Sequence, residues 1–316
     1  MNPIVSVIIP THNYGRFLGE AVDSVLCQTF HDLECIIVDD GSTDETDQVL
    51  ASFSDQRIIT TRTSRLGVSA ARNRGLDMSR GSLLAFLDAD DRWRPDKLKR
   101  QVAILAEEPD VDMVFTNFVR FNSTGEWLPD QFTYVPELNQ VPSRKATANG
   151  MVIEGNPFDF LVGTREAAAW VPTVIVRRTV AGPIRFPLGI SVCEDLYYLL
   201  HVAWNSRFLA YLPDPQVEVR RHGGNSYEAG DVQANVVTIL KKLEKVAPFA
   251  GRPSFRRRLG QELATMGTAL ARQGKFMPAI EALAGSLRYR ESRQVALKSC
   301  LAFPPRWVRG LIRGVR

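Results

Sequence analysis

Three short, largely apolar runs near the N-terminus each end in a cluster of polar side chains. The runs cover Ile4–Ile9, Glu34–Val38 and Leu83–Leu87. Strands that are apolar throughout, rather than alternating, are typical of parallel sheets covered by helices on both faces. Apolar residues at helical spacing lie between the runs, for example in residues 17–26. This alternation predicts an α/β domain with a doubly wound, mainly parallel sheet.

Polar residues follow all three runs at the equivalent point, where each strand is expected to end. They are Pro10-Thr11-His12, Asp39-Asp40 and Asp88-Ala89-Asp90. Ligands of open α/β sheets bind outside the carboxyl ends of the strands. We therefore expect the three clusters to meet at one edge and to form a binding site there.

The pair Asp88 and Asp90 has the spacing of a cation site. Two carboxylates at a strand end hold a divalent cation through oxygen and leave positions for a diphosphate, whose charge the cation neutralises as it departs. The alternative is a polar turn that caps a helix expected from Arg94 to Leu105.

The pair Asp39-Asp40 also has two interpretations. A carboxylate at this position can accept a hydrogen bond from the imide or amide edge of a base, or it can form an Asx turn. We assign the base contact to Asp40 and the structural turn to Asp39, with Ser42 or Thr43 capping a helix through Leu50.

Two further motifs carry candidate chemistry in the second half of the chain. The acidic residues Glu194-Asp195 begin an expected helix, where a carboxylate serves as a general base or only complements the helix dipole. The residues Arg220-Arg221-His222 precede two glycines; they suit a diphosphate or its metal, or form a solvated basic loop.

Four segments together resemble family 2 glycosyltransferases, the inverting enzymes of the GT-A fold. The likeness spans roughly residues 4–105 and extends more loosely to about 226. The segments that carry it are Ser6–Asn13, Val38–Asp44, Gly67–Asn73 and Phe86–Asp91.

The resemblance implies a donor site for a nucleotide-sugar. Pro10, Thr11 and His12 would line the nucleotide pocket, with His12 standing where the family commonly has tyrosine. Asp40 would bind the imide edge of uracil, which favours a UDP-sugar. Arg65 would supply a charge to the donor.

The resemblance also implies the catalytic groups. Asp88 and Asp90 would form the DXD motif on Mn²⁺ or Mg²⁺, and His222 would lie near the metal or the diphosphate. Asp195 would deprotonate an acceptor hydroxyl that attacks the anomeric carbon opposite the nucleotide, inverting its configuration. Arg72 would line the donor or only hold its loop.

The charge of the chain divides sharply. Residues 231–316 carry 17 Lys and Arg against 5 Asp and Glu, whereas residues 1–230 carry 22 against 30. We expect a GT-A domain over 1–230 and a basic helical extension over 231–316. An acidic body does not suit nucleic-acid binding, whereas the segment Phe303–Arg316 suits an amphipathic helix on anionic lipid, or a helix packed on the body.

These features predict a cytoplasmic enzyme, peripheral on the cytoplasmic face of the membrane if the tail binds lipid. No signal peptide or spanning segment is evident, and the four cysteines have no CxxC spacing. The expected acceptor is a glycan or lipid-linked saccharide of surface-polysaccharide assembly. Two alternatives are a nucleotidyltransferase and a non-catalytic sugar-nucleotide or glycan-binding protein. Against the first, no glycine-rich, lysine-containing loop follows the first strand.

Overall fold

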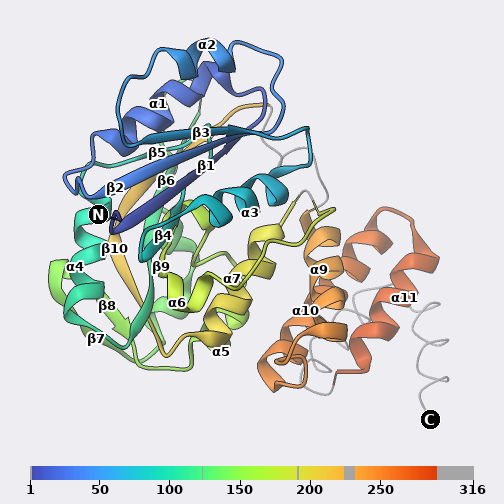
Figure 1. Ribbon diagram of the computed structural model, residues 1–316. Coiled ribbons are helices and arrows are strands. Elements are labelled where there is room, and N and C mark those ends of the chain that lie inside the picture. The colour runs from blue at the N-terminus through green and yellow to red at the C-terminus, as the bar shows by residue number, and fades with distance from the viewer. Residues whose placement is uncertain (1, 123, 191, 224–231, 290–316) are drawn as a thin grey trace. The chain divides into compact units, whose positions relative to one another are not determined.

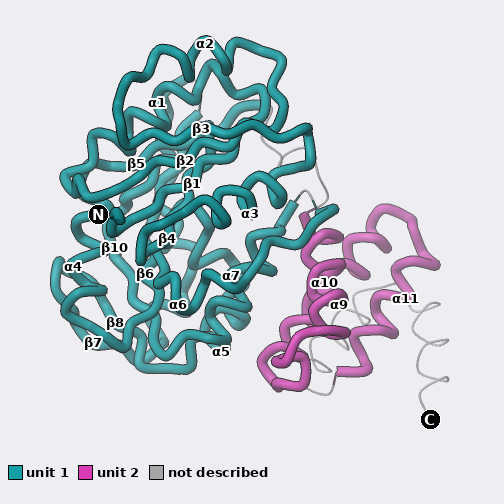
Figure 2. Tube along the Cα trace, in the orientation of Figure 1, with its two compact units in different colours: residues 1–228 teal, residues 229–316 magenta. Residues whose placement is uncertain are grey.

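The computed structural model describes residues 2–122, 124–190, 192–223 and 232–289. The chain divides into two compact units, residues 1–228 and 229–316 (Figure 2). The first unit contains the sheet and the candidate site, and the second is helical in its described part.

A mixed sheet of ten strands forms the centre of the first unit (Figure 1). The strand order is β3-β2-β1-β4-β9-β6-β10-β8-β7, and β5 pairs with β10. Strands β1 to β4 are mutually parallel where they pair, as are β6 and β10, whereas β5, β7, β8 and β9 run antiparallel to their neighbours. The strands are β1 (Val5–Thr11), β2 (Leu33–Asp39), β3 (Ile58–Arg62), β4 (Leu83–Phe86), β5 (Arg92–Trp93), β6 (Val111–Asn122), β7 (Ser143–Lys145), β8 (Met151–Ile153), β9 (Ile175–Arg177) and β10 (Phe208–Arg221). The sheet confirms the expected doubly wound, mainly parallel architecture.

Helices cover both faces of this sheet. The helices of the first unit are α1 (Gly15–Leu26), α2 (Thr46–Ala51), α3 (Val68–Met78), α4 (Lys97–Glu107), α5 (Pro157–Gly163), α6 (Arg178–Ala181) and α7 (Glu194–Asn205). Short 3-10 turns lie at Gln131–Tyr134, Pro136–Asn139, Thr147–Asn149 and Val171–Thr173. Figure 1 shows α1 and α3 on opposite sides of β1 and β2.

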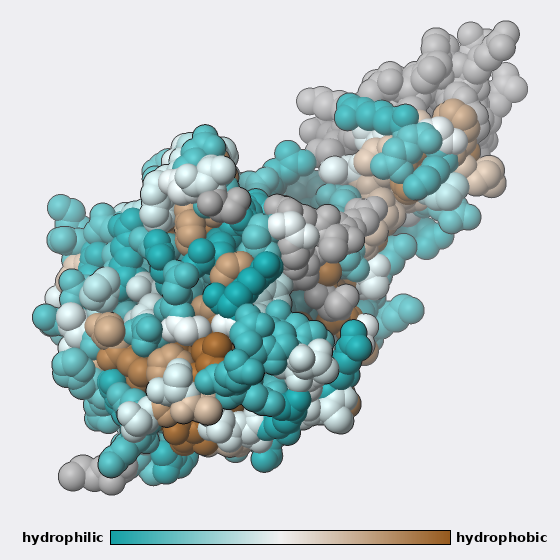
Figure 3. Space-filling view, turned by 90° about the horizontal axis from the view of Figure 1, so that it is seen from above, coloured by the Kyte–Doolittle hydropathy of each residue, from teal (hydrophilic) through white to brown (hydrophobic). Residues whose placement is uncertain are grey.

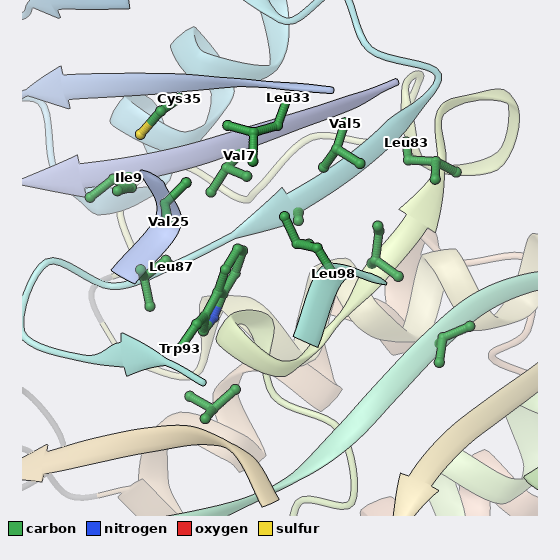
Figure 4. Close-up of a cluster of buried hydrophobic side chains, with 14 of the residues drawn as sticks. Val5, Val7, Ile9, Val25, Leu33, Cys35, Leu83, Leu87, Trp93 and Leu98 are labelled. Carbon is green, nitrogen blue, oxygen red and sulfur yellow. The ribbon is translucent and has the colours of Figure 1, made fainter. Parts of the chain in front are cut away.

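The two faces follow from the alternation of side chains along β1. Val5, Val7 and Ile9 point into the core cluster that includes α1 and α4 (Figure 4). Ile8 points to the opposite face, where α3 approaches so closely that a Cβ on Gly75 would overlap the Ile8 side chain. Burying these side chains contributes about 1.5–3 kcal/mol each, so the N-terminal strands form a rigid support for the residues at their ends.

Two expected helix starts are wrong by several residues. Helix α2 begins at Thr46 because the Asp44 carboxylate accepts hydrogen bonds from the backbone N–H groups of Thr46 and Gly15, while the Ser42 hydroxyl accepts one from the N–H of Asn13. Helix α4 begins at Lys97, not Arg94, because β5 pairs with β10 just before it.

Three further segments of the sequence have patterns that the structure corrects. The apolar residues 170–176 predict a strand, but the strand is confined to β9, because residues 171–173 form a 3-10 turn that contains a proline near its start. Residues 216–219 predict a short strand, and they are the end of the much longer β10. Residues 122–165 are rich in Pro, Asn, Thr and Gly and predict a long loop, which contains β7, β8, α5 and several short turns.

The second unit contains α9 (Val232–Val246), α10 (Pro253–Arg272) and α11 (Phe276–Leu287). Helices α10 and α11 pack closely, since a Cβ on Gly267 would meet the Leu283 side chain at 2.7 Å. No helix in the described part of the chain is long and apolar enough to cross a membrane. The amphipathic segment expected at 303–316 lies outside the described residues.

Candidate active site

The carboxyl ends of β1, β2 and β4 lie side by side. Thr11 pairs with Asp39 across β1 and β2, and the N–H of Leu87, just after β4, donates to the carbonyl of Ile8 in β1. The strand order reverses direction at β1, which has β2 on one side and β4 on the other. This is the switch point at which open α/β sheets bind ligands.

A buried arginine joins two of the predicted acidic motifs. One Nη of Arg72 donates to Asp88 at 2.7 Å, and the other donates to Glu194 at the start of α7. Arg72 is 3% exposed. Burial alone would lower the pKa of Arg72, but the charges of Asp88 and Glu194 outweigh it and raise that pKa. Arg72 therefore connects the acidic residues after β4 with the acidic helix start, and Glu194 lies 122 residues beyond Arg72 in the chain.

Asn73, next to Arg72 in the chain, reinforces this connection. Its side-chain amide donates to the carbonyl of Phe186 and accepts from the N–H of Phe186. The Phe186 ring lies 5.3 Å from the Arg72 guanidinium and stacks on Tyr198 of α7. Of the two roles that the sequence left open for Arg72, these contacts support the one of holding the local structure.

Asp90 and His222 form a second contact at the same edge. His222 Nε2 lies 3.0 Å from Asp90 Oδ2, although the two residues are 132 positions apart. Burial, followed by the charge of Asp88, raises the pKa of Asp90. Asp91 accepts a hydrogen bond from the backbone N–H of Arg220, and burial together with the charge of Asp90 raises its pKa well above the usual range.

Two aromatic residues that the sequence analysis did not single out pack on His222. The rings of Tyr14 and Phe17 lie 5.7 Å and 4.8 Å from the imidazole. Burial raises the pKa of Tyr14 to about 12, and the charges of Asp90 and Asp88 add to this effect. In the sequence, Tyr14 and Phe17 are marked only by their position directly after His12, at the start of a helix.

The predicted metal ligands are close to one another but are not assembled as a metal site. Among the residues that the structure describes, no three His, Cys, Asp or Glu side chains are grouped to hold a metal ion. Asp88 faces Arg72, and Asp90 faces His222. The two carboxylates nevertheless fit a hard divalent cation. They lie with Asp91 in a largely buried group, which we call the acidic cluster (Asp88, Asp90 and Asp91), and the pKa of Asp90 is raised there.

The residues expected to line a nucleotide pocket, among them Thr11, His12 and Asp40, lie at the ends of β1 and β2. The Thr11 hydroxyl is buried and has no hydrogen-bond partner among the described residues, whereas His12 Nδ1 lies 2.8 Å from the carbonyl of Asp40. Pro10 is buried within β1, opposite Val38 of β2.

Asp40 has partners that the sequence did not predict. Its carboxylate accepts hydrogen bonds from the Thr63 hydroxyl and from the N–H groups of Leu66 and Gly67. Burial would raise the pKa of Asp40, but these hydrogen bonds outweigh it and lower that pKa. Oδ2 accepts only the hydrogen bond from the Gly67 N–H, and a carboxylate oxygen can accept two hydrogen bonds. An N–H group of a nucleotide base that donates to Asp40 would therefore share the carboxylate with the loop.

Two neighbours of Asp40, Asp39 and Arg65, differ in their contacts. Asp39 accepts the N–H of Ser42, as expected for the structural aspartate of the pair. Arg65 is exposed and lies in the same loop as Leu66, with a positive φ of 56°.

Asp195 lies half-buried in the first turn of α7. Its Oδ1 accepts the backbone N–H of Leu196 at 2.8 Å. Burial, with the charge of Glu194 added, raises the pKa of Asp195 to about 7, while Arg72 opposes the shift. A carboxyl group with such a pKa can accept a proton near neutral pH. The sequence identified Glu194-Asp195 as a unit, but only the structure shows that Glu194 is the member paired with Arg72.

Residues 6–170 match the family model for Glycosyl transferase family 2. The chain belongs to glycosyltransferase family 2. This confirms the family that the four segments resemble.

Two curated relatives each match less than half of the chain. The putative teichuronic acid biosynthesis glycosyltransferase TuaG of Bacillus subtilis is 38% identical over 138 residues, which are 43% of this chain and 54% of that protein. A PGL/p-HBAD biosynthesis glycosyltransferase of Mycobacterium bovis is 37% identical over 40% of this chain and 50% of its own length. The matched part thus spans about half the length of these relatives.

Solved structures confirm the GT-A-type fold of this family 2 protein. Staphylococcus aureus TarS 1-349, in complex with UDP-GlcNAc, has a TM-score of 0.64 at 20% identity, covering 98% of this chain and 84% of that one. The mannosyltransferase PcManGT of Pyrobaculum calidifontis, in complex with GDP-Man and Mn²⁺, has a TM-score of 0.57 at 19% identity, covering 99% and 84%. At these identities the likeness concerns the fold.

Proposed function

We propose that this chain is an inverting, metal-dependent glycosyltransferase that moves a sugar from a UDP-sugar to a hydroxyl of a glycan or lipid-linked saccharide. The observation that carries the proposal is the Asp88–Arg72–Glu194 contact. Glu194, which precedes Asp195 in the chain, and Asp88, the first aspartate of the proposed DXD motif, share the same buried arginine. Burial raises the pKa of Asp195 to about 7, which supports its role as the base. The contact supports the proposal because it connects the proposed base with the proposed diphosphate-binding edge.

In the proposed reaction, Asp195 accepts the proton of the acceptor hydroxyl as its oxygen forms the new bond to the anomeric carbon. The bond from that carbon to the nucleotide diphosphate breaks in the same displacement, so its configuration inverts. Arg72 and Glu194 hold the start of α7, and thereby Asp195, relative to Asp88. His222, beside Asp90, is in position to donate a hydrogen bond to the departing diphosphate.

Asp88 and Asp90 would hold a Mn²⁺ or Mg²⁺ ion through carboxylate oxygens. When bound, this ion would neutralise negative charge that develops on the diphosphate. Arg72 contacts one oxygen of Asp88 and His222 contacts one oxygen of Asp90, so each carboxylate would have a second oxygen for the ion.

A UDP-sugar is the proposed donor because Asp40 lies at the carboxyl end of β2, where it can accept the imide N–H of uracil. The imidazole of His12 and the hydroxyl of Thr11, which has no partner in the described part of the chain, lie at the neighbouring strand end. Arg65, exposed in the loop that Asp40 holds, is proposed to approach the donor phosphates. A structural neighbour, TarS 1-349, was solved with UDP-GlcNAc.

For the acceptor we propose a saccharide of surface-polysaccharide assembly. Relatives carry names from teichuronic acid and PGL/p-HBAD biosynthesis. The basic region 231–316 is proposed to attract the enzyme to the anionic cytoplasmic face of a membrane, because about 1 kcal/mol is gained per basic residue near such a surface.

The test is release of nucleotide from UDP-, GDP- and dTDP-sugars, followed with and without Mn²⁺ and a saccharide acceptor mixture. The proposal expects turnover with UDP-sugars, a product with inverted anomeric configuration by NMR, and loss of transfer in Asp195→Asn with UDP binding intact. Tight donor binding without turnover by the wild type would instead indicate a non-catalytic sugar-nucleotide-binding protein.

A further inference from the structure

A small hairpin extends the sheet beside the end of β6. The N–H of Asn122 donates to the carbonyl of Glu126, and the N–H of Leu128 donates to the carbonyl of Arg120. Trp127 is the antiparallel bridge partner of Phe121, and the two rings pack at 5.2 Å. The backbone on both sides of Trp127 is thus hydrogen-bonded, and its side chain is held against a neighbouring ring.

The same row of side chains continues onto β10. Arg220 is the register partner of Phe121 on the parallel neighbouring strand, so both side chains point to one face. The Arg220 guanidinium lies 4.7 Å from the Phe121 ring and 4.8 Å from the Phe17 ring of α1. Trp127, Phe121, Arg220 and Phe17 therefore form a continuous row of packed side chains, which we call the aromatic row.

The aromatic row adjoins the acidic cluster. Arg220 donates through Nε to the carbonyl of Asp90 at 3.1 Å, and through its backbone N–H to Asp91. The Phe17 ring packs on His222, which faces Asp90. One end of the row is thus anchored at the residues proposed to receive the diphosphate.

The other end of the row is open to solvent. Trp127 is 48% exposed, whereas Phe121 beneath it is 6% exposed. Leu128, the next residue, is 41% exposed. A tryptophan that is fixed by its backbone and by one ring contact, yet half-exposed, presents a rigid apolar surface at little cost in side-chain entropy. Hydrophilic side chains cover much of the visible surface of this unit, and apolar ones gather in smaller areas (Figure 3).

The charges along the row favour a neutral occupant over an anionic one. Arg92, which also stacks on Phe121, is paired with Glu218 and Glu20, and Arg220 is paired with Glu20. Both arginines that contact the row are therefore ion-paired, with Glu20 shared between them and Glu218 shared between Arg92 and Arg94. A pyranose has a matching shape, with an apolar C–H face that stacks on an indole and hydroxyls at its edge.

The strand order separates the row from the proposed nucleotide pocket. Asp40 follows β2, whereas Trp127 pairs with β6, and β1, β4 and β9 lie between these strands. The acidic residues after β4 lie between the two regions in this order. A molecule on the row therefore approaches the acidic cluster from the side opposite to the nucleotide.

We propose that Trp127 is the stacking platform for a pyranose ring of the acceptor saccharide, and hence a specificity-determining residue. This inference rests on the proposed function, because it assigns the second substrate of that site. The row fixes the platform through Phe121 and Arg220, and the acceptor sugar lies on the indole with its reacting hydroxyl directed toward the acidic cluster.

The test is binding of the labelled full chain to an immobilised array of bacterial and synthetic oligosaccharides, in the presence of UDP and Mn²⁺. The compared proteins are wild type, Trp127→Ala, Trp127→Phe and Phe208→Ala. Phe208 is the matched control, an aromatic residue that is 36% exposed at the amino end of β10, the far end of that strand from Arg220. UDP affinity of each protein is measured separately by calorimetry.

We expect saturable saccharide binding that weakens about tenfold or more in Trp127→Ala, is largely retained in Trp127→Phe, and is unchanged in Phe208→Ala. UDP affinity should be equal in all four proteins. Equal saccharide affinity of wild type and Trp127→Ala, or UDP binding by a wild type that binds no saccharide, would overturn the platform. Saccharide binding that depends on Trp127 in a protein that binds no nucleotide would instead overturn the transferase proposal and leave the platform standing.

Discussion

Replacing Arg72 by methionine removes a guanidinium that pairs with both Asp88 and Glu194. Its side chain is 4% exposed, and the two carboxylates are 21% and 9% exposed. Removing one partner of a buried ion pair costs about 3–5 kcal/mol, because it leaves an uncompensated buried charge. Two carboxylates are left here, but Asp88 is partly solvated, so we expect a loss within this range at neutral pH.

The assay is thermal or urea unfolding followed by tryptophan fluorescence. Four of the five tryptophans lie in residues 1–228, so the signal reports mainly on the unit that contains Arg72. For a unit of this size, a loss of 3–5 kcal/mol corresponds to a decrease in Tm of roughly 6–20 °C.

Two controls make the result specific. Arg207→Met removes an ion pair with Asp110 in which both side chains are mostly exposed, and such pairs contribute about 0–1 kcal/mol. Arg72→Lys keeps the charge but cannot bridge two carboxylates with a fork of donors, so an intermediate loss is expected. The reasoning is refuted if Arg72→Met unfolds within about 1 kcal/mol of the wild type, as expected for the Arg207 control.

Three further outcomes follow from the site and its support. Lys97 is fully buried over the Trp93 ring and donates to the side-chain oxygen of Gln101, and burial lowers its pKa well below the usual range, so the unfolded state binds more protons and stability rises with pH. Lys97→Met removes this proton linkage, so its free energy of unfolding in urea relative to wild type should decrease from pH 7 toward pH 10. Because burial raises the pKa of Asp195 to about 7, kcat/KM should increase tenfold per pH unit below pH 7 and level off above it. Above pH 7 the native Asp195 carboxylate is charged and half-buried, so Asp195→Asn should unfold at a higher urea concentration than wild type. Thr11→Val should leave Tm unchanged or higher, because the buried hydroxyl has no partner among the described residues, but should weaken UDP binding in calorimetry; unchanged UDP affinity would remove Thr11 from the pocket.

The sequence predicts those parts of the fold that depend on residues close together in the chain. Apolar runs near Val7 and Ile36 identify strands, and turn residues directly after them identify strand ends. Because parallel strands end at one edge, the proximity of Thr11, Asp39 and Asp88 followed from their positions in the chain alone. The errors at α2 and α4 arose where local caps or strand pairing moved a boundary by a few residues.

The contacts that connect the site were not accessible to the same reasoning. Arg72 meets Glu194 across 122 residues, and Asp90 meets His222 across 132. Such pairings depend on how distant helices pack, and no spacing in one sequence encodes them. The loop that engages Asp40, and the row that ends in Trp127, are likewise products of tertiary packing.

The central claim is that this site binds a nucleoside diphosphate through the carboxylates after β4. Calorimetric titration of UDP, GDP, dTDP and CMP, with and without Mn²⁺, tests it most directly, with Asp90→Ala as the variant. The account predicts Mn²⁺-dependent binding of UDP that Asp90→Ala loses while its unfolding transition is retained. A folded wild type that binds none of the four nucleotides, or binds UDP equally well without metal and in Asp90→Ala, would contradict it.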